Sequence, residues 1–166
     1  MMAIHSWVPW LDATAPSMFI KNHTWVWPTC QVLHFFGLIM LFGNVGLLDL
    51  RILGLMKELP AKPLNRFVRW GVFGFGFSFL TGLIFFVGQP TQYMGSTPFY
   101  IKLSLIALAG LNVAAFYATG MFRRVEALGP GDDAPVMAKF IAAASLSLWI
   151  GVMYCGRMLT FLGKAF

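Results

Sequence analysis

Four long apolar runs, almost free of charge, constrain this chain more than any other feature. They cover about residues 27–48, 68–87, 98–122 and 136–159. A helix of about 20 apolar residues crosses a hydrocarbon core about 30 Å thick, because each residue rises about 1.5 Å. The sequence therefore predicts an all-α, polytopic membrane protein built as a four-transmembrane-helix bundle.

The composition agrees with a lipid bilayer as the main partner of the chain. Hydrophobic residues make up 58% of the sequence and charged residues 11%, whereas soluble domains carry about 25% charged residues. The formal net charge is +6. The basic residues lie mostly between the apolar runs rather than in a stripe interleaved with aromatics, so no nucleic-acid partner is expected.

The residues before the first run predict a separate segment. Residues 1–26 are rich in tryptophan and are interrupted by Pro9 and Pro16, so we expect a short segment along the outer interface. No basic region followed by an apolar stretch marks a signal peptide, so the first span is expected to direct insertion. Residues 27–166 form the predicted transmembrane domain.

Lysines and arginines predict the orientation. Eight are predicted on the side of the loop between spans 1 and 2 and the loop between spans 3 and 4: Arg51, Lys57, Lys62, Arg66, Arg69, Arg123, Arg124 and Lys139. Four are predicted on the side of the termini: Lys21, Lys102, Arg157 and Lys164. The positive-inside rule then places both termini in the periplasm and both loops in the cytoplasm of a bacterium.

Polar side chains within the spans have a structural and a functional interpretation. An ionisable group in mid-membrane costs about 2.5–3.5 kcal/mol on insertion scales, so it usually faces protein or water. His34 lies seven residues after Trp27, about 10 Å below the outer end of its span. It is either a neutral imidazole bonded to a neighbouring helix or an axial haem ligand.

Lys102 and Arg157 lie at a similar predicted depth on other helices. Snorkelling explains Lys102 and the helix dipole explains Arg157, but both could instead turn inward toward an anionic or redox-active ligand. An outer pocket of this kind includes the candidate cofactor-binding residues His34, Lys102, Arg157, Tyr154, Met153 and Gln31, with His34 as the haem-iron ligand.

At the inner end of the first span, Asp49 and Arg51 predict a structural ion pair. Asn112, midway along the third span, is expected to bridge two helices. Cys30 and Cys155 are more simply buried thiols than a disulfide. The glycines of the first two spans favour close helix contacts within one bundle, although a homodimer seam is the alternative.

Several motifs resemble known families. One segment from each span resembles an uncharacterised bacterial family of four-helix integral membrane proteins. The segments are "WPTCQVLHFFGLIMLFGNVGLLDLRILG", "LTGLIFFVGQPTQYM", "STPFYIKLSLIALAGLN" and "SLSLWIGVMYCGRMLTFLG". More distantly, the order of a first-span histidine, "LTG" and "YIKL" is similar to copper-resistance D membrane proteins and to four-helix haem-containing protoporphyrinogen oxidases. The resemblance to the oxidases implies functional roles for His34 and Lys102. Asn112 departs from that pattern, which has a further histidine in the third span.

These observations leave three hypotheses of function. The first is a redox or haem-binding membrane protein, with haem b and a quinone as cofactors, that transfers electrons between quinone and a periplasmic partner. The second is a non-enzymatic accessory or assembly subunit of a larger membrane complex. The third is a small-solute or metal-ion transporter, which needs a polar path from the outer residues to Asp49. Whether the protein is an enzyme stays open.

Overall fold

The computed structural model describes residues 7–162, apart from the side chains of residues 65, 160 and 162. Within that range every regular element is a helix. The termini, including Lys164 of the predicted outer side, lie outside the described residues.

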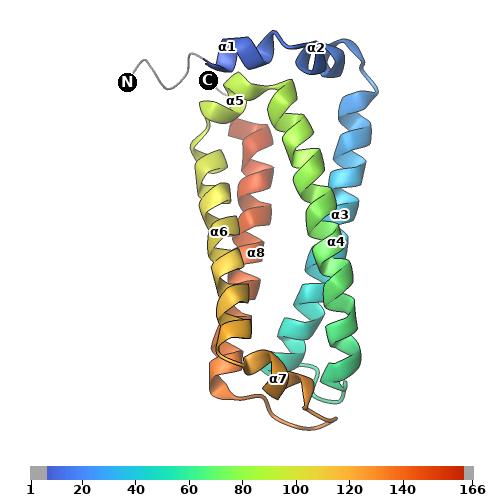
Figure 1. The fold of residues 1–166 in the computed structure, drawn as a ribbon, viewed down its shortest axis with the longest axis vertical. Coiled ribbons are helices and arrows are strands. Elements are labelled where there is room, and N and C mark those ends of the chain that lie inside the picture. The colour runs from blue at the N-terminus through green and yellow to red at the C-terminus, as the bar shows by residue number, and fades with distance from the viewer. Residues whose placement is uncertain (1–6, 163–166) are drawn as a thin grey trace.

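Four helices are long and apolar enough to cross a membrane. They are α3 (Val26–Leu53), α4 (Ala61–Gly88), α6 (Thr97–Ala118) and α8 (Val136–Leu162), and they run side by side along the long axis (Figure 1). The predicted all-α bundle with four spans is thus confirmed.

Three of the predicted boundaries need correction. Helix α3 extends to Leu53, where Gly54 ends it at φ 93°, and α4 begins seven residues before the predicted start, at Ala61. Helix α6 ends at Ala118 rather than Phe122, because Gly120 adopts φ 70°. Glycine tolerates that left-handed conformation. The chain then forms the short helix α7 (Met121–Glu126).

Short helices cover the opposite end of the bundle. Helices α1 (Trp7–Asp12) and α2 (Ala15–Asn22) lie across the ends of the long helices, next to α5 (Pro90–Met94) (Figure 1). Helix α2 contacts α4, and α1 contacts α5. The residues expected to form an outer segment therefore fold against the bundle.

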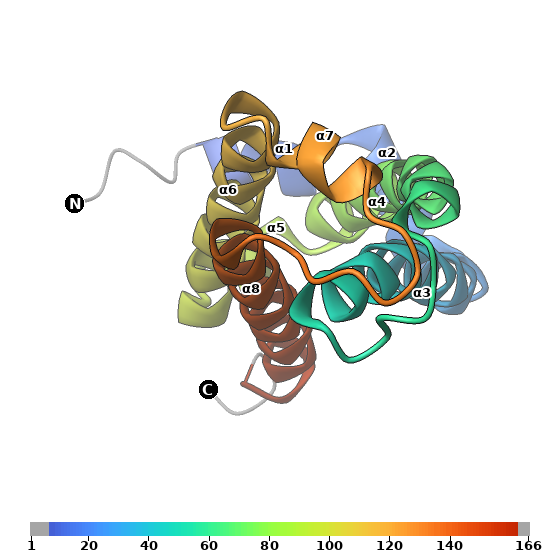
Figure 2. The same ribbon diagram turned by 90° about the horizontal axis from the view of Figure 1, so that it is seen from below.

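The long helices associate as two hairpins, α3 with α4 and α6 with α8, joined mainly by contacts between α3 and α8. Seen from the α7 end, the two pairs lie on opposite sides of the bundle (Figure 2). Helices α4 and α6 make few, if any, contacts with each other. The bundle is therefore closed along α3 and α8 and looser between α4 and α6.

Glycines allow a close contact between α3 and α4. A β-carbon on Gly74 would lie 2.6 Å from the carbonyl oxygen of Gly37, and one on Gly37 would lie 2.5 Å from Ser78 Oγ. No atom lies within 4 Å of a β-carbon built on Gly43 or Gly76. Gly37 and Gly74 therefore let α3 and α4 approach closely, whereas Gly43 and Gly76 are not part of that helix contact.

Two further expectations are confirmed. Asn112 Nδ2 donates to the carbonyl oxygen of Ile141 at 3.0 Å and so joins α6 to α8. Cys30 and Cys155 are buried free thiols.

Candidate functional site

His34 lies between α3 and α4 and is held by a threonine. Its Nδ1 lies 2.8 Å from Thr81 Oγ1, which in turn lies 2.9 Å from the carbonyl oxygen of Phe77. Ser78 Oγ donates to the carbonyl oxygen of His34 at 3.3 Å. Helix α4 thus fixes both the ring and the backbone of this histidine.

The contacts of the Thr81 hydroxyl favour one tautomer of the His34 imidazole. Threonine has one hydroxyl hydrogen, and a backbone carbonyl can only accept. We therefore assign that hydrogen to the carbonyl of Phe77, which makes Thr81 Oγ1 the acceptor for His34 Nδ1–H. His34 Nε2 then keeps its lone pair and can act as a ligand atom.

Aromatic rings cover His34 on the side toward the start of α3. The ring of Phe85 meets the imidazole edge-on at 5.6 Å between centroids, and the ring of Trp27 lies 4.9 Å from that of Phe85. The imidazole is half-buried, so protein surrounds much of it rather than lipid.

Lys102 is the second predicted site residue that turns into the bundle. Its side chain is half-buried and lies against Gly156 of α8, where an added β-carbon would come within 3.4 Å of Nζ. Its ammonium group is close enough to the His34 imidazole for their charges to interact. The structure therefore brings His34 and Lys102 near each other.

The other candidates are arranged differently. Arg157 and Tyr154 are exposed on α8, and the Arg157 guanidinium carbon lies 4.9 Å from the centroid of the Phe161 ring. Met153 and Gln31 are half-buried. None of these four contacts His34 through a described hydrogen bond or ring contact.

The predicted ion pair between Asp49 and Arg51 is wrong. Neither residue belongs to an ion pair within the described part of the chain. Residues at i and i+2 of a helix do not face each other, so the two side chains leave α3 on different sides. Each has its own environment.

Arg51 is fully buried and binds backbone carbonyls. Its Nε donates to Leu59, its Nη2 donates to Gly129 at 2.7 Å, and its Nη1 donates to Asp132 at 3.1 Å. These acceptors belong to the loop between α3 and α4 and to the loop between α7 and α8, which passes the end of α3 (Figure 2). Arg51 therefore joins the two loops of the α7 end.

Asp133 joins the same loops at the surface. Its carboxylate oxygens lie 3.0 Å from Lys57 Nζ and 2.8 Å from Lys139 Nζ. Hydrogen bonds from Lys139 and Lys57 lower the pKa of Asp133 to about 2.

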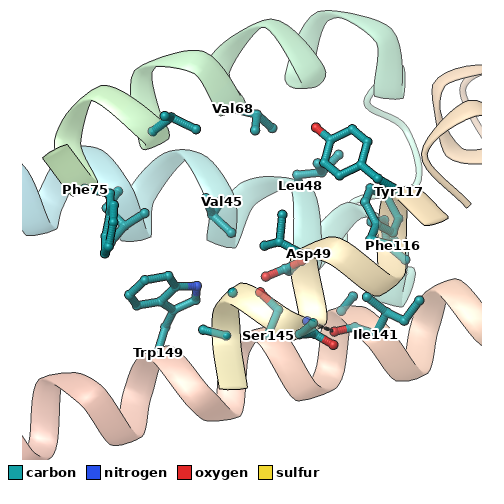
Figure 3. A pocket seen from close by; sticks show the side chains of 18 of the residues that line it. Val45, Leu48, Asp49, Val68, Phe75, Phe116, Tyr117, Ile141, Ser145 and Trp149 are labelled. Atoms are coloured by element: carbon teal, nitrogen blue, oxygen red, sulfur yellow. Dashed lines mark hydrogen bonds between the residues drawn. The ribbon is translucent and has the colours of Figure 1, made fainter. Parts of the chain in front are cut away.

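Asp49 lines a cavity of about 300 Å³ in the half of the bundle nearer α7. The walls come mainly from α3, α4, α6 and α8, and they are apolar except for a few side chains, among them Asp49, Asn112 and Ser145. Figure 3 shows Asp49 next to Ser145, with Phe75 and Trp149 toward one end of the cavity and Phe116 and Tyr117 toward the other. His34, Lys102 and Arg157 are not among the lining residues.

Two residues that hold the candidate site residues were not identified from the sequence: Thr81, which binds His34, and Ser145, which binds Asp49. Thr81 belongs to the "LTG" motif, and its polarity within an apolar span was an available signal. Ser145 lies in a run of small residues, "AAASLS", and only the packing of α8 against α3 distinguishes it from the neighbouring serine Ser147.

Comparison with protein-family models, with curated proteins and with solved structures found no match for this chain. The fold defines the class: an all-α protein with four helices of membrane-spanning length and composition.

Proposed function

We propose that this chain is an integral membrane redox protein that holds haem b through His34 Nε2. The observation that carries the proposal is the bond between His34 Nδ1 and Thr81, which orients the ring and leaves the other nitrogen as a ligand atom. The porphyrin supplies four of the iron ligands, so one protein imidazole suffices for a five-coordinate haem.

The residues near His34 fit a haem in two further respects. Lys102 supplies a positive charge in the same region, which suits a propionate. The rings of Phe85 and Trp27 give the apolar surroundings that a porphyrin face requires. When bound, the haem iron would carry one electron at a time, in exchange with a quinone and a periplasmic partner.

The distribution of basic residues supports an orientation in a bacterial inner membrane with both termini in the periplasm. The loops at the α7 end and the adjoining helix ends carry eight lysines and arginines, against three described ones, Lys21, Lys102 and Arg157, toward the other end. In this orientation His34 and Lys102 lie in the periplasmic half, where a periplasmic electron partner could approach.

An absorption spectrum of the full-length protein, purified in detergent from haem-proficient cells, tests the proposal. We expect a Soret band that is lost in His34→Ala. His23→Ala is the matched control, because His23 is an exposed histidine whose Nδ1 lies 2.9 Å from the carbonyl oxygen of Phe19. Equal haem content in wild type and His34→Ala, or no haem in either, would overturn the proposal.

A further inference from the structure

The cavity between the hairpins contains a carboxylate with one oxygen for which the described part of the protein supplies no hydrogen-bond donor. The Asp49 side chain is buried, with 6% of the residue exposed, and its Oδ2 has no hydrogen-bond partner. Ser145 is a hydrogen-bond partner of the same carboxyl group. An unpaired polar group in an apolar interior is costly, so this oxygen calls for a donor that the described protein does not supply.

No basic side chain of the cavity wall can be that donor. The lining residues include no lysine, arginine or histidine. Arg51 is two residues away on α3, but it donates to three loop carbonyls instead. Asn112 donates to the carbonyl of Ile141. No described side chain donates to Asp49 Oδ2, so an occupant of the cavity can supply that donor.

The aromatic walls favour a positively charged occupant. Phe75 and Trp149 pack edge to face at 6.2 Å on one side of Asp49, and Phe116 and Tyr117 lie on the other (Figure 3). Aromatic faces attract cations, most strongly where water is excluded. A carboxylate between aromatic rings therefore complements an ammonium group.

The shape of the cavity favours an occupant that arrives from the bilayer. Helices α4 and α6 both line the cavity and scarcely contact each other. The lining residues Val72 and Val113 are 64% and 45% exposed on these two helices. An apolar molecule dissolved in lipid could pass between them.

We propose that this cavity is a binding site for a lipophilic organic cation. Its ammonium group donates to Asp49 Oδ2, and its apolar body lies along the aromatic and aliphatic wall. The volume of about 300 Å³ matches the lower range of sites for small organic ligands, about 300–1,000 Å³. The site is separate from His34 and does not depend on the proposed haem.

Equilibrium dialysis of the full-length protein in nanodiscs against 1-naphthylmethylamine tests the proposal, with empty nanodiscs as the blank for partition into lipid. 1-Naphthalenemethanol has nearly the same shape but no charge. We expect the amine to bind about 10- to 100-fold more tightly than the alcohol, because only the amine forms a charge-assisted hydrogen bond with Asp49.

Two variants of the cavity and one control locate the binding. Asp49→Asn should weaken amine binding by about the same 10- to 100-fold. Gly110→Leu keeps the carboxylate but adds a large side chain at the lining of the cavity, where a β-carbon meets no atom within 4 Å, and should also weaken binding. Asp12→Asn, at the opposite end of the molecule, should bind as wild type does.

The outcomes separate the alternatives. Equal binding of amine and alcohol, or unchanged amine binding in both cavity variants, would show partition of an apolar molecule and overturn the proposal. Absence of amine binding to the wild-type protein would also overturn it. Haem content measured on the same samples reports on the His34 site independently, because Asp49→Asn should leave it unchanged.

Discussion

Arg51 Nη2 donates to the carbonyl oxygen of Gly129 at 2.7 Å, across 78 positions of the sequence. This bond connects the end of the first span to the loop that precedes the last one. The same guanidinium also binds the carbonyls of Leu59 and Asp132. One buried side chain thus binds both loops at the α7 end.

Arg51→Met should destabilise the protein by about 3–5 kcal/mol, because the substitution leaves three carbonyls without their charged donor. The measurement is unfolding in detergent, followed by circular dichroism. Arg69→Met, which alters an exposed arginine of α4, is the control and should stay near wild type. A small effect at Arg51 would mean that the loops hold each other without it.

Gly74→Ala should destabilise the α3–α4 contact by about 1–3 kcal/mol, the usual cost of overpacking. The new β-carbon would lie 2.6 Å from a backbone oxygen of α3 and 2.8 Å from a backbone nitrogen, and neither can move independently of the helix. The same unfolding assay measures the change.

Gly76→Ala, on the same helix, is the matched control. Its β-carbon meets nothing within 4 Å, so the substitution should be neutral or stabilising by up to about 1 kcal/mol through helix propensity. Equal effects at the two glycines would contradict the packing explanation.

The ion pairs of Asp133 predict a pH dependence confined to acid. Lys139 and Lys57 lower the pKa of Asp133 from 3.8 to about 2. Since the pKa is lower in the folded state, the stabilisation is fully present above about pH 4 and is lost as the pH falls through about 2. Carboxyl NMR shifts measured from pH 7 to pH 2 should show this late titration.

Asp133→Asn supplies the corresponding comparison. Any difference in stability between the wild type and this variant should be constant from neutral pH to about pH 4 and should shrink below it. A difference that disappears nearer pH 6 would assign the effect to another group.

Thr81→Val should lower haem affinity by about 10- to 100-fold if His34 is the ligand, since loss of the partner that orients a ligating histidine has effects of this size. Thr81→Ser should restore binding because it keeps the hydroxyl. Thr29→Val is the control. The Thr29 hydroxyl donates to the carbonyl oxygen four residues earlier, as that of Thr81 does, but it has no described hydrogen bond to His34. Haem titration of each apoprotein measures the affinities.

The four spans follow from the sequence because hydropathy and length are local properties. Crossing a bilayer demands about 20 consecutive apolar residues, whatever their neighbours are. The same property explains the error at the end of α6. The apolar run continues to Phe122, but hydropathy does not report the left-handed backbone of Gly120 that ends the helix.

Only the tertiary structure decides which way each polar side chain turns. The depth of His34, Lys102 and Arg157 can be counted along the chain, yet Lys102 turns inward while Arg157 is exposed. The partners of Asp49 and Arg51 likewise depend on α8 and on distant loops. The sequence determined the spans and the depth of their polar residues, because both follow from distance along one helix; the pairing of those residues required the rotation and packing of the helices against each other.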